Sequence, residues 1–166
     1  MGSGKSTAGQ KLAAMLKVNF IDLDAYIEKK EKADIPTIFE QKGEAGFRTI
    51  ESDCLDEILR LNKASVISLG GGTVCFHSNL EKIKEKGLLI YIQLTPVVLA
   101  ERIRKSKTTR PLLKNLSEEE LLKNIEEILS ERGKYYTQAQ ITVNGLNLSP
   151  QLLNQKIIGL LQENIH

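Results

Sequence analysis

The stretch Met1-Gly2-Ser3-Gly4-Lys5-Ser6-Thr7 matches most of the phosphate-binding loop pattern G-x-x-x-x-G-K-[ST]. In such a loop, glycines let backbone amides curl around an anion, and the N-terminus of the next helix adds positive potential. Lys5 would then reach the β- and γ-phosphates of a nucleotide, and the Ser6 hydroxyl would bind Mg²⁺. We expect the first glycine of the pattern, and an apolar strand of about ten residues that feeds it, to lie before Met1. The alternative for this stretch is a flexible Gly/Ser end followed by a helix.

The size and composition indicate a single globular domain over residues 1–166. The hydrophobic share of 41% and the charged share of 27% are ordinary for a soluble protein. We see no secretory signal pattern and no apolar run of about 18 residues, so we expect a cytoplasmic protein without a membrane partner. The net charge of +2 is too small to indicate a nucleic-acid partner, and without a heptad pattern we expect a monomer.

Strand-like and helix-like segments alternate along the chain. We predict strands at 18–24, 64–69, 88–94 and 140–144. Helices are predicted at 7–16, 25–32, 80–86, 95–104 and 117–133. Another helix should begin near 35–37, a long helix should end near 62, and the last helix should begin at 150. The near-continuous apolarity of 88–94 favours a strand buried on both faces. The pattern therefore predicts an α/β fold, a three-layer sandwich around a central parallel sheet.

Three polar segments should meet at one edge of this sheet, because ligands of open parallel sheets bind beyond the carboxyl ends of the strands. They are the loop at 1–7, the pair Asp22 and Asp24 at the carboxyl end of the first predicted strand, and the glycine run 70–72 after the second. Two carboxylates at i and i+2 on a strand share a face, so one can support a metal while the other accepts a proton from a substrate hydroxyl. The alternative for Asp24 is an N-cap of the following helix.

Two arginines are candidates for binding an anionic substrate. Arg48 is predicted in the first turn of its helix, where a cation opposes the helix dipole, so an anionic partner is indicated. The alternative is a surface arginine paired with Glu44 or Glu51. Arg132 lies near the end of its predicted helix, where the dipole favours a cation. Only the other candidate site residues make it a candidate as well. The basic segment at about 105–116 has the composition of an active-site lid.

The ordered set of motifs resembles the shikimate kinase family. The resemblance runs over nearly the whole chain, from the loop at 2–6 through Asp22-Leu23-Asp24, the GEAGFR run at 43–48, Gly70-Gly71-Gly72 and Arg110-Pro111-Leu112-Leu113 to Arg132 and Tyr136. It implies a P-loop NTPase fold like that of nucleoside monophosphate kinases. It also implies transfer of the ATP γ-phosphoryl group to the 3-hydroxyl of shikimate, in the route to chorismate and the aromatic amino acids. One departure is Lys134, where the family usually has a proline.

The resemblance also implies roles for individual residues. Asp24 would bind shikimate hydroxyls and act as the base, Lys5 and Arg110 would be catalytic, and Ser6 and Asp22 would hold one Mg²⁺. The shikimate site would use the helical segment at about 24–62, with Arg48 and Arg132 on the substrate carboxylate and Gly70, Gly71 and Gly72 lining the pocket. The residues implied for ATP are Gly2, Ser3, Gly4, Lys5, Ser6, Thr7, Arg104 over the adenine, and Arg110.

Two other functions compete with this one. The first is another small-molecule kinase on the same fold, such as a gluconate or nucleoside monophosphate kinase. Two arginines for one carboxylate and a short lid favour a small hydroxy acid instead. The second is a nucleotide-binding module without catalytic activity.

Overall fold

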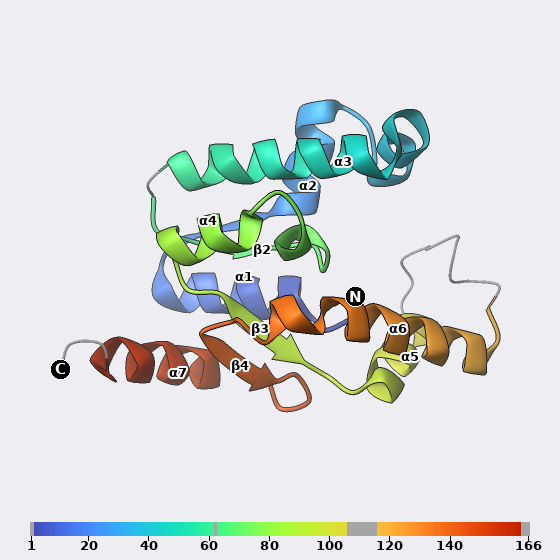
Figure 1. Cartoon of the computed structure of the whole chain (residues 1–166). Coiled ribbons are helices and arrows are strands. Elements are labelled where there is room, and N and C mark those ends of the chain that lie inside the picture. The colour runs from blue at the N-terminus through green and yellow to red at the C-terminus, as the bar shows by residue number, and fades with distance from the viewer. Residues whose placement is uncertain (1, 62, 106–115, 164–166) are drawn as a thin grey trace.

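The computed structural model describes residues 2–61, 63–105 and 116–163 (Figure 1). The elements, in chain order, are α1 Lys5–Leu16, β1 Asn19–Asp22, α2 Leu23–Glu31, α3 Ile35–Arg60, β2 Ser65–Ser68, the 3₁₀ helix η1 Thr73–Cys75, α4 Asn79–Lys86, β3 Ile90–Gln93, α5 Pro96–Lys105, α6 Glu118–Tyr136, β4 Ile141–Asn144 and α7 Pro150–Glu163. The predicted alternation of strands and helices is confirmed. None of the helices in these ranges is long and apolar enough to span a membrane.

The strands form two parallel pairs. β1 pairs with β2 from Asn19 opposite Ser65 onward, and β3 pairs with β4 from Ile90 opposite Ile141 onward. Within the described residues the two pairs are not hydrogen-bonded to each other. The parallel direction agrees with the prediction, while the expected strand before Met1 lies outside the described residues.

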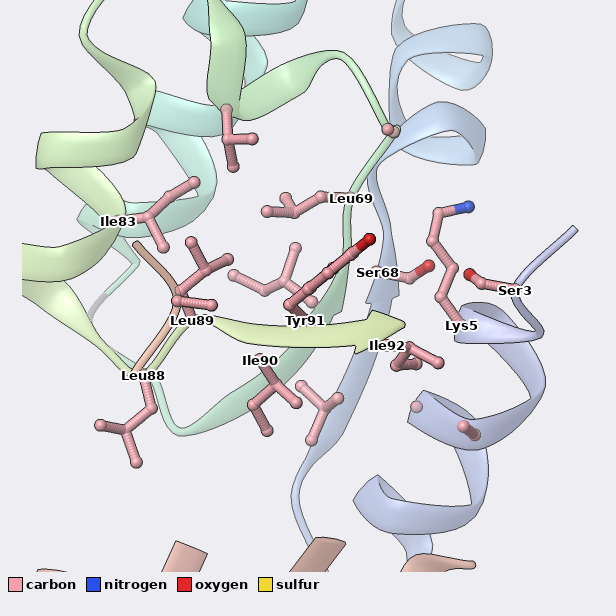
Figure 2. A pocket seen from close by; sticks show the side chains of 18 of the residues that line it. Ser3, Lys5, Ser68, Leu69, Ile83, Leu88, Leu89, Ile90, Tyr91 and Ile92 are labelled. Carbon is pink, nitrogen blue, oxygen red and sulfur yellow. The ribbon is translucent and has the colours of Figure 1, made fainter. Parts of the chain in front are cut away.

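A cavity of about 680 Å³ lies between β2 and β3. Apolar side chains of both strands line its body, whereas Ser3, Lys5 and Ser68 gather at one end (Figure 2). That end lies at the carboxyl ends of the strands, where ligands of parallel sheets bind. The polar end therefore belongs to the candidate site, and the apolar body is the space between the two strand pairs.

Helices cover the strands and fix the site. α1 packs against β1, β2 and α7, α2 against α3, and α5 against α6. In Figure 1, α2, α3 and α4 lie on one side of the molecule, and β4 and α7 on the other. Leu23 and Ile27 of α2 and Leu55 of α3 are completely buried, so this interface anchors the segment that carries the candidate substrate residues.

The boundary between β1 and α2 differs from the prediction. The strand ends at Asp22 and α2 begins at Leu23, so Asp24 lies in a helical turn and not on a strand. Asp22 is the N-cap, and its side chain accepts a hydrogen bond from the Ala25 N–H at 3.4 Å. Both the shared strand face and the N-cap alternative for Asp24 are therefore wrong, because the capping carboxylate stops the strand two residues earlier.

Two helices also differ from the prediction. Gly43, with φ 65° and ψ −178°, interrupts α3, and Arg48 lies one turn past this break and not in a first turn. α6 was expected to end near Gly133 but continues to Tyr136. A proline at 134 would remove a backbone donor and clash with the preceding turn, and Lys134 has neither effect.

Candidate active site

The described part of the phosphate loop leads into the N-terminus of α1. Gly2 and Gly4 have φ values of 67° and 83°, which glycine adopts without strain. Gly4 caps α1 without a side-chain hydrogen bond, and the first turn contains no acidic residue. The amides and dipole of this helix end can therefore bind an anion.

Arg102 of α5 holds this loop in place. Its Nη1 donates to the Ser3 carbonyl at 3.1 Å, and its Nη2 donates to the Gly145 carbonyl at 3.1 Å. The guanidinium thus joins the phosphate loop to the segment after β4. Sequence reasoning missed Arg102, although its spacing of three from the buried Leu99 places both on one helix side.

Three oxygen-bearing side chains meet where α1, β1 and β2 converge. Ser6 Oγ donates to Asp22 Oδ2 at 2.8 Å and lies 3.1 Å from Ser68 Oγ. Ser68 was not predicted as a site residue, although it directly precedes the loop with the glycine run. A hydroxyl and a carboxylate beside a phosphate site suit Mg²⁺, which takes few protein ligands and keeps water and phosphate oxygens. No group of three His, Cys, Asp or Glu residues suited to a metal occurs in the described ranges.

Asp24 lies between the phosphate loop and the glycine run. Its carboxylate is half-buried, and an ideal Cβ on Gly70 would lie 3.4 Å from Asp24 Oδ1. Burial raises the pKa of Asp24 above the usual range, the positive charge of Lys5 opposes this rise, and the neighbouring charge of Asp22 adds to it. The structure thus brings Asp24 together with Lys5 and Gly70, and its raised pKa makes it a better proton acceptor.

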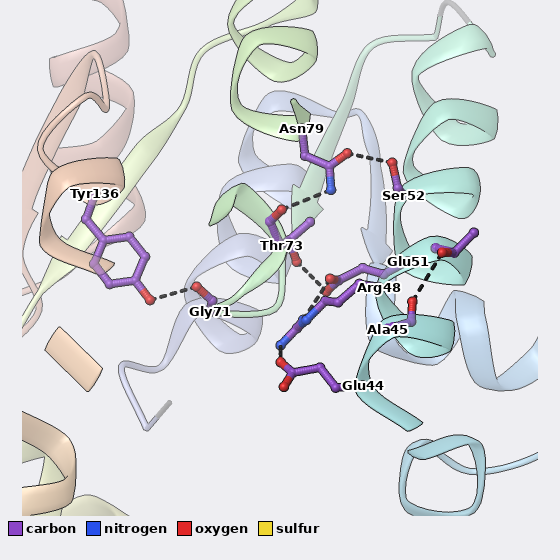
Figure 3. Close-up of polar contacts among 10 residues, drawn as sticks. Glu44, Ala45, Arg48, Glu51, Ser52, Gly71, Thr73, Asn79 and Tyr136 are labelled. Atoms are coloured by element: carbon purple, nitrogen blue, oxygen red, sulfur yellow. Dashed lines mark hydrogen bonds and ion pairs between the residues drawn. The ribbon is translucent and has the colours of Figure 1, made fainter. Parts of the chain in front are cut away.

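Arg48 is a buried cation and not a surface residue, with 8% of its area exposed. Its Nη1 donates to Glu51 Oε2 at 2.8 Å and its Nη2 to Glu44 Oε1 at 3.3 Å (Figure 3). The guanidinium carbon also lies 4.4 Å from the ring centre of Phe76. Arg48 Nε is buried and has no hydrogen-bond partner within the described residues. The surface alternative for Arg48 is wrong, although both proposed glutamate partners do bind it.

The glycine run permits close approach to this cation. An ideal Cβ on Gly72 would lie 2.7 Å from Arg48 Nη2 and 2.9 Å from Arg48 Cζ. Thr73, the next residue, donates from its hydroxyl to Glu51 Oε1 at 2.6 Å. Asn79 Nδ2 in turn donates to the Thr73 carbonyl at 2.9 Å (Figure 3). These contacts fix the loop after β2 against α3. Glu51 accepts hydrogen bonds from both Arg48 and Thr73, whereas the sequence indicated it only as a possible surface partner of Arg48.

Arg132 approaches the same loop from α6. Burial raises the pKa of Cys75, and both Arg132 and Arg48 oppose that rise, so both cations act on one thiol of η1. Arg132 also lines the cavity between β2 and β3, as do Lys5 and Gly71. The two arginines predicted to share a substrate thus lie near a common segment.

The structure does not bring Arg104 to this site, and a second predicted residue lies outside the described residues. Arg104 is exposed at the end of α5 and forms an ion pair of 3.0 Å with Glu118. Arg110 and residues 106–115 of the predicted lid lie outside the described residues. The role of Arg110 stays a prediction.

The chain is similar to known proteins over nearly its whole length. The family model described as "Shikimate kinase" matches residues 1–162. A shikimate kinase of Bacteroides thetaiotaomicron is 38% identical over 163 residues, which is 98% of this chain and 93% of that protein.

Solved structures give the same result. The crystal structure of shikimate kinase from Bacteroides thetaiotaomicron matches with a TM-score of 0.89 and 37% identity, over 98% of this chain and 94% of that one. Shikimate kinase from Acinetobacter baumannii in complex with shikimate matches with a TM-score of 0.84 and 36% identity, over 99% and 89% of the two chains. These matches confirm the predicted P-loop fold, and the chain belongs to the shikimate kinase family.

Proposed function

We propose that this chain transfers the γ-phosphoryl group of ATP to the 3-hydroxyl of shikimate, which yields shikimate 3-phosphate and ADP. The observation that best supports this reaction is the position of the buried Arg48 guanidinium, which lies against Gly72 while Asp24 lies against the neighbouring Gly70. A carboxylate binder and a proton acceptor thus border the same short glycine segment. A relative at 36% identity has been solved with shikimate bound.

In this proposal Arg48 and Arg132 bind the carboxylate of shikimate. Arg48 reaches it with a guanidinium that Glu51 already orients and whose Nε still lacks a partner within the described residues. Arginine suits this task because its planar donors match the two oxygens of a carboxylate. Gly70, Gly71 and Gly72 line the pocket in this proposal. A Cβ on Gly70 would lie 3.1 Å from Glu51 Oε1 and from Thr73 Oγ1, and a Cβ on Gly72 would displace Arg48.

Asp24 acts as the base at the reacting hydroxyl. The substrate 3-hydroxyl loses its proton to an Asp24 carboxylate oxygen as its own oxygen forms the bond to the γ-phosphorus, and the bond from that phosphorus to the bridging oxygen of ADP breaks. The raised pKa of Asp24 supports this role, because proton transfer is most effective when the pKa of the base approaches the working pH.

Lys5, the amides of residues 2–7 and the N-terminus of α1 bind the ATP phosphates. Arg110 supplies a further positive charge from the lid. Ser6 and Asp22 would hold Mg²⁺, which when bound neutralises charge on the phosphate oxygens. We further propose that Arg102 keeps the loop in its binding shape through the Ser3 and Gly145 carbonyls. The monomeric state, the cytoplasmic location and the contact of Arg104 with adenine stay predictions.

A substrate panel tests the proposed function. Purified chain is incubated with Mg²⁺ and ATP plus shikimate, gluconate or a nucleoside monophosphate, and ADP release is followed in a coupled assay. We expect turnover with shikimate and with neither of the other two acceptors. ³¹P and ¹H NMR should then find the phosphate on the 3-oxygen of shikimate. Turnover with another acceptor would favour the rival kinases, and calorimetric binding of both ATP and shikimate without turnover would favour a noncatalytic module.

A further inference from the structure

Tyr136, the last residue of α6, contacts the glycine run directly. Its phenol donates a hydrogen bond to the Gly71 carbonyl at 2.7 Å (Figure 3). Gly71 lies between Gly70, which borders Asp24, and Gly72, which borders Arg48. The hydroxyl of Tyr136 is therefore hydrogen-bonded to the glycine segment that borders both Asp24, the proposed base, and Arg48, the proposed carboxylate binder.

The same phenol oxygen also interacts with Arg132. The two residues lie four positions apart on α6, on one helix side. Burial raises the pKa of Tyr136, and the nearby Arg132 guanidinium opposes that rise, so the guanidinium lies close to the phenol oxygen. A phenol can donate one hydrogen bond and accept others at the same time. Tyr136 can thus accept from the Arg132 guanidinium while it donates to Gly71, so one oxygen connects α6 with the loop after β2.

We propose that Tyr136 is a positioning residue, whose hydroxyl sets Arg132 and the glycine run at the spacing that the substrate carboxylate requires. This inference rests on the proposed role of Arg132 in shikimate binding. Tyr136 itself does not need to touch the substrate. It acts by fixing two groups that come from distant parts of the chain.

Two further observations separate the hydroxyl from the ring. The ring is half-buried and stacks on Tyr91, with ring centres 5.0 Å apart and an angle of 23° between the planes, so a phenylalanine would keep this packing. Burial raises the pKa of Tyr136 above its usual value, so the phenol keeps its proton at neutral pH and remains a donor to Gly71. The hydroxyl is thus the part whose removal tests the proposal.

The test compares Tyr136→Phe with Tyr135→Phe, a matched loss of one hydroxyl at the preceding residue. We expect Tyr136→Phe to raise the KM for shikimate about tenfold, the effect of losing roughly one hydrogen bond, with the KM for ATP within about twofold. Tyr135→Phe should leave both values unchanged. An unchanged KM for shikimate in Tyr136→Phe would overturn the proposal. So would equal rises in both KM values together with a lower melting temperature, because these indicate a general packing role.

Arg132→Lys distinguishes this inference from the site assignment beneath it. We expect Arg132→Lys to raise the KM for shikimate, and the double variant with Tyr136→Phe to raise it less than the product of the two single effects. If Arg132→Lys raises KM and Tyr136→Phe does not, the positioning role fails and the role of Arg132 stands. If neither variant changes KM, both assignments fail. If the two effects multiply fully, the bridge through the shared oxygen is wrong.

Discussion

A methyl group added at Gly72 should weaken shikimate binding specifically. In Gly72→Ala the new Cβ would lie 2.7 Å from Arg48 Nη2 and 2.9 Å from both Cζ and Nη1. Ordinary contacts between such atoms are about 3.5 Å or longer, so the guanidinium must move by roughly 0.8 Å. The conformation of residue 72 is not the obstacle, because its φ is −87°. The effect therefore comes from contact with Arg48.

The size of the effect follows from what holds Arg48. The guanidinium donates to Glu51 at 2.8 Å and lies over Phe76 at 4.4 Å, so a shift of this size disturbs a buried, charged hydrogen bond. The displaced guanidinium would also lose its proposed hydrogen bond to the substrate carboxylate, and a hydrogen bond to a charged group contributes about 1.5–3 kcal/mol. At 1.4 kcal/mol per factor of ten, we expect the KM for shikimate to rise about 10- to 150-fold, with the KM for ATP nearly unchanged.

Steady-state kinetics with a coupled ADP assay measure both KM values. Gly159→Ala is the matched control. Apart from its chain neighbours and its own helix backbone, no heavy atom of the described residues lies within 4 Å of the Cβ that it would add in α7. A KM for shikimate within about twofold of wild type in Gly72→Ala would refute the reasoning. A rise in the KM for ATP alone would show that the glycine run contacts the nucleotide instead.

Three other changes test neighbouring parts of the site. Arg48→Lys should raise the KM for shikimate about tenfold or more, because lysine lacks the planar donor pair of arginine. A lower affinity for ATP with an unchanged KM for shikimate would contradict the carboxylate role. Burial raises the pKa of Asp24, and the base must be ionised to accept a proton, so kcat/KM should fall as the pH drops through a midpoint above the ordinary pKa of an aspartate. A midpoint at or below that ordinary pKa in a pH profile would contradict the assignment. Glu51→Gln leaves Glu44 as the one carboxylate that pairs with the buried Arg48 among the described residues. Thermal or urea melts should therefore show a loss of up to about 3 kcal/mol in unfolding free energy, and an unchanged melt would show that the pair adds nothing.

The sequence was sufficient for the order of elements and for the main site segments. Runs such as 88–94 and the capping residues Ser117 and Glu120 are local signals. The structure confirms the capping box and a strand at Ile90–Gln93, although this strand is only partly buried. The phosphate loop, the glycine run and the aspartates around the end of β1 could be placed because parallel strands bring their carboxyl ends together.

Tertiary contacts account for what could not be predicted. Glu51 was visible as a neighbour of Arg48 at i+3, but its burial depends on Thr73 and on the loop after β2. Ser68 belongs to the site because β2 pairs with β1 and its last residue, Ser68, lies beside the Ser6 hydroxyl. Arg102 and Arg104 look alike in sequence, and helix geometry directs one to the phosphate loop and the other to Glu118.

Replacing the proposed base tests the central claim most directly. Asp24→Asn keeps the shape of the side chain and removes its ability to accept a proton at neutral pH. In the coupled assay with saturating ATP and shikimate, we predict that kcat falls about 10²- to 10⁴-fold, with an unchanged melting temperature to confirm the fold. A kcat within about threefold of wild type would contradict the claim that Asp24, between the phosphate loop and the glycine run, takes the proton in this reaction.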